Sequence, residues 1–237
     1  MGIGYRPEEF LTNNHFGEVG QRVSDWYYRL VRFVGRSAFF VSSRPVVLHA
    51  ERADREGPYI IASNHFSAYD VAVLIRHTPR LLDFVSIAEM FRAPLARWFL
   101  TNMNAMPLNR GRVDTVTTRE ILERLARGRV VAMFPEGRVQ DEAGSVLNGG
   151  KIRTGVFGIA RKANVPIIPC VVLGTRAYRR FAQWMPVRAT VYAMNYGEPM
   201  FPSERWDDLE VAENELRAAY QQLHQELLEA LKGMPVQ

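Results

Sequence analysis

Hydrophobic residues follow two different spacings along this chain, and each spacing predicts one kind of element. Short continuous apolar runs are typical of strands buried on both faces of a sheet. Longer stretches whose apolar residues recur at steps of three and four are typical of amphipathic helices. The runs predict strands at 45–49, 59–63, 82–87, 104–108, 130–134, 167–173 and 188–196, and the periodic stretches predict helices at 17–41, 70–77, 91–103, 113–127, 151–164 and 206–231.

The order of these elements indicates the fold class. From about residue 46 to residue 200 the predicted strands alternate with predicted helices, which is typical of βαβ units. We therefore expect an α/β fold with a mostly parallel sheet flanked by helices, preceded by an N-terminal amphipathic helical segment. The expected boundaries are 1–44 for this segment and 45–237 for the α/β domain.

The N-terminal segment has two distinct faces in its predicted helix. One face is apolar and another is basic, and the residues that define them are Trp26, Tyr27, Leu30 and Val34, and Arg22, Arg29, Arg32 and Arg36. This combination is typical of a helix that lies at the interface of an anionic membrane without crossing it. The alternative is a helix packed on the sheet with its arginines in water.

The charge and the cysteine content of the chain indicate which binding partners and which cellular compartment suit the protein. The formal net charge is +5 and the pI is about 9.5, which favours anionic partners. Cys170 is the one cysteine, so no intrachain disulfide forms and a reducing compartment is natural. No apolar run reaches the roughly 18 residues of a membrane-spanning helix, and residues 1–10 do not resemble a secretory signal. We expect a peripheral protein on the cytoplasmic side of a membrane.

A histidine and an aspartate follow the predicted strand at 59–63. His65 comes soon after the strand, and Asp70 lies at the start of the next predicted helix. Because ligands bind beyond the carboxyl ends of strands in open α/β sheets, this turn is a candidate site. Asp70 is expected to accept from one imidazole nitrogen, which leaves the other free to take a proton from an alcohol. The alternative is a histidine in a turn and an aspartate that caps a helix. The same spacing recurs at His49 and Asp54, in a charged stretch that we interpret as a solvated turn.

A second block, Phe134-Pro135-Glu136-Gly137-Arg138, leaves the predicted strand at 130–134. Gly137 permits a positive φ and close approach of the backbone. Glu136 is expected to orient substrate hydroxyls, and Arg138 is expected to bind a phosphate. The alternative is an ordinary turn with solvated charges.

A third block places two arginines around a glycine just after the predicted strand at 104–108. Arg110 and Arg112 flank Gly111, and forked guanidinium groups beside a glycine suit an anion. The alternative is a basic surface turn. A fourth block, Val165 to Pro169, opens a buried strand, and we interpret it as mainly structural.

Taken in this order, the four blocks resemble the glycerolipid acyltransferase superfamily, typified by 1-acylglycerol-3-phosphate O-acyltransferase. That family shows Asn-His-x4-Asp, an arginine-bearing block, Phe-Pro-Glu-Gly and a Val-Pro-Ile-x-Pro strand. The matching residues are Asn64-His65 with Asp70, Arg110, Phe134 to Gly137, and Val165 to Pro169. Many members have a threonine between the glycine and the arginine, whereas Arg138 follows Gly137 directly here. This departure leaves the reach of the arginine and the identity of the acceptor open.

The resemblance implies transfer of a fatty acyl group from acyl-CoA or acyl-carrier protein to a lysolipid, first of all 1-acylglycerol-3-phosphate. It implies His65 as general base with Asp70 as its partner, within an acyltransferase domain at 45–237. The candidate substrate-binding residues are Asn64, Arg110, Arg112, Glu136, Gly137 and Arg138. No cofactor is expected beyond the acyl donor, which is itself a substrate.

Other classes of function are less consistent with the sequence. No paired histidines stand at metal-ligand spacing, so we expect no metal. The basic residues lack the interleaved aromatics of nucleic-acid binders, so we expect no nucleic acid. Since no serine or cysteine lies in a nucleophile elbow, the acceptor hydroxyl itself is expected to attack. Acyl transfer to another lysolipid, or a non-catalytic lipid-binding protein on the same fold, are the alternatives, and the intact His65 and Asp70 argue against the second.

Overall fold

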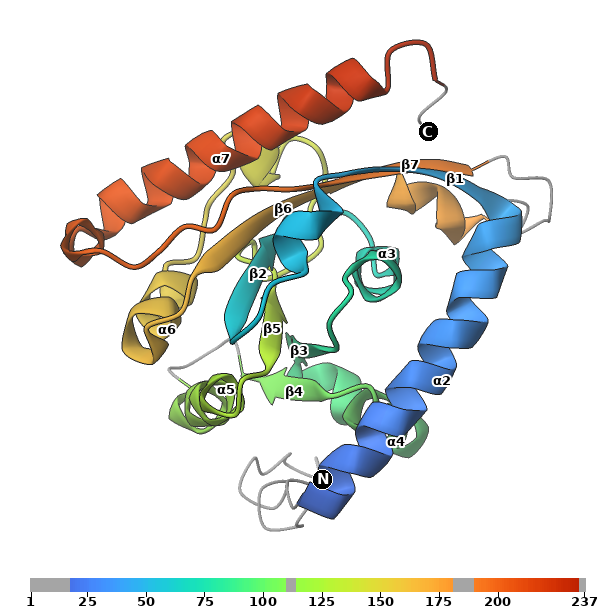
Figure 1. The fold of residues 1–237 in the computed structure, drawn as a ribbon, viewed down its shortest axis with the longest axis vertical. Helices are drawn as coiled ribbons and strands as arrows, with labels where there is room; N and C mark the ends of the chain where they lie inside the picture. The colour runs from blue at the N-terminus through green and yellow to red at the C-terminus, as the bar shows by residue number, and fades with distance from the viewer. Residues whose placement is uncertain (1–17, 110–113, 181–189, 235–237) are drawn as a thin grey trace, which may run out of the picture.

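The computed structural model describes residues 18–109, 114–180 and 190–234 (Figure 1). In chain order its main elements are α2 (Glu18–Ser42), β1 (Ser43–Leu48), β2 (Tyr59–Ser63), α3 (Tyr69–His77), β3 (Leu82–Ile87), α4 (Pro94–Asn102), β4 (Ala105–Leu108), α5 (Thr115–Ala126), β5 (Val130–Met133), α6 (Gly155–Ala163), β6 (Ile167–Leu173), β7 (Thr190–Tyr196) and α7 (Leu209–Ala230). Strands and helices alternate as the apolar spacing predicts.

The described strands form one sheet in the order β1-β7-β6-β2-β5-β3-β4. Strands β6, β2, β5, β3 and β4 run parallel to one another. Strand β7 is antiparallel to β6, and β1 pairs parallel with β7. The prediction of a mostly parallel sheet is therefore confirmed. Because β2 lies between β6 and β5, the turns that follow these three strands meet at one edge of the sheet.

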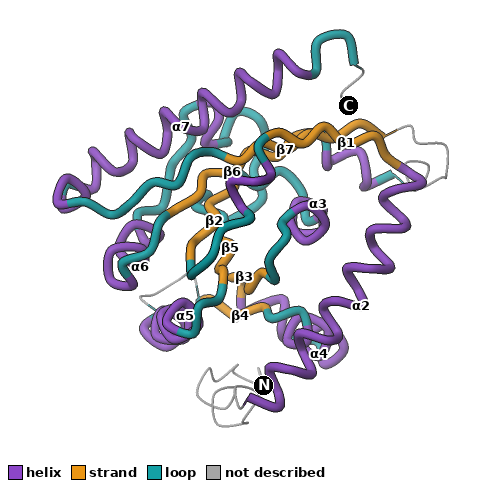
Figure 2. Tube along the Cα trace, in the orientation of Figure 1, coloured by secondary structure: helices purple, strands orange, loops and turns teal. Residues whose placement is uncertain are grey.

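Helices cover both faces of this sheet (Figures 1 and 2). Helices α5, α6 and α7 lie on one face, and α2, α3 and α4 lie on the other. Strand β2 shows why, because its alternate residues enter two separate apolar clusters. Ile60 and Ala62 pack with the first set of helices, whereas Tyr59 and Ile61 pack with the second. A strand buried on both faces needs the continuous apolar run that the sequence shows.

Helices α4, α6 and α7 begin three or four residues later than the apolar spacing predicts; α7 starts at Leu209 and not at 206, after a short 3₁₀ turn at Glu204–Asp207. Helix α4 starts at Pro94, a residue suited to the first turn of a helix, and the residues before it form a short 3₁₀ turn at Ala88–Phe91. Helix α6 starts at Gly155 and not at 151, because the N–H of Arg153 donates to the carbonyl of Pro135 (2.8 Å). A long-range bond of this kind cannot be seen in the spacing. The predicted ends at 113 and at 188–189 lie outside the described residues.

One side of helix α2 ties it to the sheet. Tyr28 and Phe39 are buried in the apolar cluster on that face. Near the start of the helix, Asp25 accepts from Arg129 (Nη2 to Oδ1, 3.0 Å), and Arg129 also binds the buried Asp83. This shared guanidinium links α2 to β3. Part of the alternative interpretation therefore holds, because α2 does pack on the domain.

The opposite side of α2 carries large apolar side chains that are exposed to solvent. We call these residues the exposed stripe: Val23, Trp26, Leu30, Phe33, Val34, Phe40 and Val41. Helix α4 extends the surface with Leu95, Trp98 and Phe99, and Trp98 contacts Tyr27 of α2 with ring centroids 5.2 Å apart.

Two further observations qualify the predicted N-terminal segment. Arg32, expected on the basic face, is half-buried and donates to the carbonyl of Pro79 (3.0 Å). Among the described residues, no helix has both the length and the apolar character required to cross a membrane.

Candidate active site

Asn64 joins the end of β2 to the neighbouring strand. Its side chain is fully buried, donates to the carbonyl of Val172 (2.9 Å) and accepts from the N–H of the same residue (2.8 Å). The amide thus continues the pairing of β2 with β6 one step beyond the strand. We expected Asn64 to bind substrate, but its donor and acceptor are both used in this pairing. Its place in the site is to set the position of the following residue.

His65 and Asp70 are brought together by the turn between β2 and α3. The imidazole Nδ1 lies 2.9 Å from Oδ2 of Asp70, as the spacing predicts. The ring stacks on Phe134 with centroids 4.0 Å apart and planes 18° apart. With Nδ1–H donated to the carboxylate, Nε2 carries the lone pair, and it has no hydrogen-bond partner within the described residues. The His65 side chain keeps 15% of its surface exposed, so this nitrogen is open to a substrate.

The Asp70 carboxylate is enclosed by donors. It is fully buried, and Oδ2 also accepts from the N–H groups of Phe66 (2.7 Å) and Ser67 (2.8 Å). Its other oxygen, Oδ1, accepts from the hydroxyl of Thr175. The position in the first turn of α3 adds the favourable field of the helix dipole. These contacts support a negative charge beside the imidazole and fix its geometry.

Sequence reasoning missed Thr175. It lies 105 residues from Asp70 in the chain, just after β6, and its side chain is buried. The neighbouring Arg176 lies over the ring of Phe66, with its Cζ 4.9 Å from the centroid, and donates to the carbonyl of Gln140. The only available signal was the position of both residues beyond the carboxyl end of a buried strand.

Glu136 holds the two motif turns against each other. Its Oε2 accepts from the N–H of His65 (2.7 Å), and Oε1 accepts from the hydroxyl of Ser145 and the N–H of Val146 (both 2.9 Å). Burial raises the pKa of this carboxyl, and the hydrogen bonds from Val146 and Ser145 partly offset the effect. We expected Glu136 to orient substrate hydroxyls. In the structure Oε2 is instead used by the N–H of His65, and Oε1 is used by Ser145 and Val146, which makes Glu136 a positioning residue.

Gly137 and the residues around it form a tight basic turn. Gly137 has a φ of 71°, and a Cβ there would collide with the side chain of Arg153. Arg138 is exposed and makes no hydrogen bond or ion pair within the described residues. Arg153, which the sequence analysis did not select, is also exposed and crosses the backbone of Gly137. Two cationic side chains therefore lie next to the His65 turn.

The third sequence block cannot be placed in the same way. Arg110 and Arg112, predicted to bind an anion, lie outside the described residues. The described part of the chain also holds no group of three or more histidine, cysteine, aspartate or glutamate residues that could bind a metal ion.

Comparisons with known proteins identify the family of this chain. A family model described as Acyltransferase matches residues 44–173, which is more than half of the chain. A chloroplastic 1-acyl-sn-glycerol-3-phosphate acyltransferase of Brassica napus is 30% identical over 122 residues, or 50% of this chain and 33% of that protein. A lyso-ornithine lipid O-acyltransferase of Pseudomonas aeruginosa is 31% identical over 127 residues, or 52% of this chain and 44% of that protein. The matched region thus spans less than half of either relative.

A solved structure shares the fold over nearly the whole chain. It is the 1-acyl-sn-glycerophosphate acyltransferase PlsC of Thermotoga maritima, with a TM-score of 0.67, 20% identity and coverage of 97% of this chain and 90% of that one. Because the matching family model spans the His65, Asp70 and Glu136 blocks, this chain belongs to the acyltransferase family, the glycerolipid acyltransferases that its sequence blocks resemble.

Proposed function

We propose that this chain transfers a fatty acyl group from acyl-CoA or acyl-carrier protein to the hydroxyl of a lysophospholipid, with 1-acylglycerol-3-phosphate as the first candidate acceptor. One observation carries the proposal: the His65 imidazole is bound through Nδ1 to a buried carboxylate while Nε2 stays open. Such a nitrogen is suited to take the proton of an attacking alcohol. Family membership supports the same class of reaction.

In this mechanism the acceptor hydroxyl donates to Nε2 of His65 and attacks the thioester carbonyl. The proton moves to Nε2, and the charge of Asp70 stabilises the imidazolium. The tetrahedral intermediate collapses, the C–S bond breaks, and the thiolate leaves with the proton returned from His65. The stacked ring of Phe134 limits rotation of the imidazole through these steps.

The developing oxyanion needs donors, and the backbone contacts narrow the choice. The N–H groups of His65, Phe66 and Ser67 donate to Glu136 and Asp70, and that of Gly137 donates to the carbonyl of Phe134. The next N–H along the second turn, that of Arg138, has no acceptor within the described residues. We assign it as the candidate oxyanion donor.

The acceptor headgroup is proposed to lie over Gly137, between Arg138 and Arg153. Both guanidinium groups are exposed and adjacent to the turn, and arginine binds phosphate through two parallel hydrogen bonds. A second acceptor class is also supported, because a relative of similar identity is named for a lyso-ornithine lipid. The absent threonine between Gly137 and Arg138 makes this alternative worth testing directly.

The exposed stripe and α4 are proposed to place the protein on the cytoplasmic side of a membrane without spanning it. Trp26 and Phe33 are 65% and 71% exposed, and Leu95 on α4 is 78% exposed. Contiguous apolar surface of this kind beside arginines suits an interfacial helix. This supports the predicted role of the 1–44 segment, with α4 as a second contributor.

A lysolipid panel tests the reaction. The purified chain is incubated with acyl-CoA or acyl-carrier protein as donor and with lysophosphatidate, other lysophospholipids or lyso-ornithine lipid as acceptor. Free thiol is followed with time, and products are identified by mass. We expect acceptor-dependent thiol release with one preferred acceptor, and loss of this release in the His65→Ala variant. Absence of turnover with every pair, or release unaffected by the variant, would contradict the proposal.

A further inference from the structure

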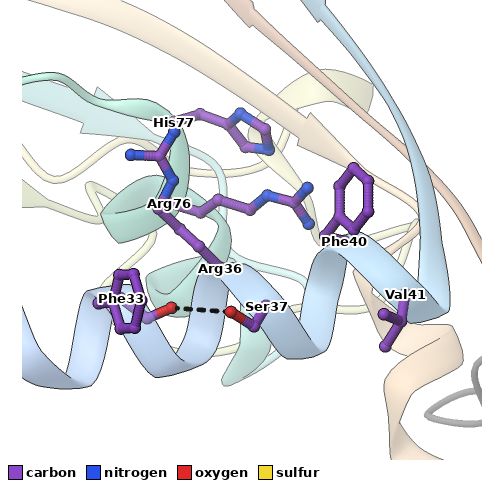
Figure 3. A pocket seen from close by; sticks show the side chains of 7 residues that line it. All are labelled: Phe33, Arg36, Ser37, Phe40, Val41, Arg76 and His77. Carbon is purple, nitrogen blue, oxygen red and sulfur yellow. Dashed lines mark hydrogen bonds between the residues drawn. The ribbon is translucent and has the colours of Figure 1, made fainter.

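A pocket of about 500 Å³ lies between α2 and the C-terminal end of α3 (Figure 3). Its lining residues are Phe33, Arg36, Ser37, Phe40, Val41, Arg76 and His77. The volume is within the range of small-molecule sites. The pocket is distinct from the candidate active site, because Asp70 is in the first turn of α3 and His77 is its last residue, about 10 Å further along the axis.

Two guanidinium groups make this pocket cationic. Arg36 comes from α2 and Arg76 comes from α3, and neither has a carboxylate partner within the described residues. Arg76 is held in place, since it donates to the hydroxyl of Ser43 (3.2 Å) and lies over the rings of Phe39 and Tyr192. A positioned, unpaired guanidinium is a ready ligand for a phosphate.

The imidazole of His77 also lines the pocket and is affected by the charges of its arginines. His77 lies 2.7 Å from the hydroxyl of Tyr192 through Nε2. Burial lowers its pKa to about 3, and the charges of Arg76, Arg36 and Arg32 act in the same direction. The imidazole is therefore neutral at neutral pH. The positive potential of the pocket comes from arginines, which keep their charge at all physiological pH values.

The rim of the pocket is apolar and continuous with the membrane-facing surface. Phe33, Phe40 and Val41 line it, and all three belong to the exposed stripe of α2. A ligand with a phosphate in the pocket would therefore have its remaining atoms beside exposed aromatic and aliphatic side chains. Cationic walls with a one-sided apolar rim match a phospholipid, whose phosphate adjoins its acyl chains, better than a nucleotide or a free anion.

We propose that the pocket between α2 and α3 binds the phosphate headgroup of an anionic membrane phospholipid, at a site separate from the one where acyl transfer takes place. The proposal goes beyond the proposed function and rests only on the part of it that places α2 at a membrane. A lipid bound there contacts both helices and fixes the orientation of α3, whose other end carries Asp70.

Short-chain lipids test the proposal without a vesicle surface. The folded full-length chain is titrated with dihexanoyl-phosphatidylglycerol below its critical micelle concentration, and binding is measured by calorimetry. Dihexanoyl-phosphatidylcholine, inorganic phosphate and coenzyme A are titrated in parallel. We expect saturable binding of phosphatidylglycerol that is at least tenfold tighter than binding of phosphatidylcholine or phosphate.

Matched variants locate the site. Arg36→Gln removes an exposed pocket arginine and should weaken phosphatidylglycerol binding tenfold or more. Arg29→Gln removes an exposed arginine one heptad earlier on α2 that does not line the pocket, and binding should be unchanged. His65→Ala should also bind normally, which separates this test from failure of the proposed reaction. Equal binding by Arg36→Gln and the wild type, no saturable lipid binding, or preference for phosphate or coenzyme A would overturn the proposal.

Discussion

The two ends of helix α3 differ in whether their charged side chains have partners within the protein. At its N-terminal end, Asp70 is fully buried and its two oxygens accept four hydrogen bonds, from His65, Phe66, Ser67 and Thr175. At its C-terminal end, Arg76 faces a pocket without a carboxylate partner in the described chain.

This difference matches the two roles that we propose for the ends of this helix. Proton transfer requires atoms held within tenths of an ångström, so the polar groups there are bound to one another. Binding of a membrane surface or headgroup requires groups whose partner is external, so cations and apolar side chains remain uncovered. Changes at the first end should therefore affect turnover, and changes at the second end should affect lipid association.

The largest effect is expected at His65. His65→Ala removes the proposed general base and should lower kcat by about 10²–10⁴ while leaving the melting temperature close to that of the wild type. His49→Asn is the matched control, because His49 has the same spacing to an aspartate and the side chain is 40% exposed. Asparagine is chosen because His49 has a φ of 54°, where alanine would be strained. Equal losses of kcat in both variants would contradict the assignment of His65 as general base.

Asp70→Asn should be the next largest effect. The amide cannot accept from His65, Phe66, Ser67 and Thr175 together, and it supplies no negative charge for the imidazolium. We expect kcat to fall at least about a hundredfold. Thr175→Val removes only the hydroxyl that binds Oδ1, so a smaller loss, with an altered pH profile of kcat/KM, is expected. Full activity in Asp70→Asn would show that the aspartate only caps the helix and has no part in the reaction.

Removal of Arg138 or Arg153 should act mainly on acceptor binding. Loss of one charge-assisted contact is worth about 1.5–3 kcal/mol, so Arg138→Ala and Arg153→Ala should raise KM for a phosphate-bearing acceptor tenfold or more with a smaller change in kcat. Arg161→Ala is the control, because this exposed arginine lies in the last turn of α6 and pairs with Asp207. Steady-state kinetics over a range of lysophosphatidate concentrations measures this. Use of an acceptor without phosphate just as well as lysophosphatidate would instead favour the second acceptor class.

The exposed stripe can be tested without truncation. Deletion of residues 1–41 would remove Tyr28, Phe39 and Asp25 from the folded domain, so a point variant is more informative. Trp26→Gln should reduce sedimentation with anionic liposomes several-fold, and wild-type binding should weaken as salt rises. Leu228→Gln, which changes an exposed leucine on α7, should bind normally. If Trp26→Gln and Leu228→Gln cosediment alike, α2 is not the docking surface.

The smallest effect concerns pH and His77. Its folded-state pKa is lowered to about 3, below the unfolded value near 6.5, so between these values the unfolded chain binds more protons. Stability from this group is therefore present above about pH 6.5 and is lost as pH falls toward 3. We expect about 1–2 kcal/mol of this loss between pH 7 and pH 5 in the wild type, and none of it in His77→Gln. Denaturant unfolding of both proteins at the two pH values measures the free energy of unfolding. If this free energy depends on pH identically in the two proteins, the pKa of His77 is not lowered by folding.

Much of the architecture was predictable from local pattern. Strands β2, β3 and β6 have the bounds that their apolar runs predict, because burial on both faces demands an uninterrupted run. The approach of His65 to Asp70 was also predictable, since both belong to one short turn between a strand and a helix. The proximity of this turn to Glu136 followed from the shared edge of parallel strands.

The sequence by itself thus determined the fold class, the family and the approach of His65 to Asp70, because each depends on residues close together in the chain. Tertiary structure decided what Asn64 and Glu136 bind, because their partners come from β6 and from the loop before α6. It also revealed Thr175, Arg153 and the pocket between α2 and α3. Such contacts join segments far apart in the chain, and local spacing carries no information on which distant side chain fills a given position.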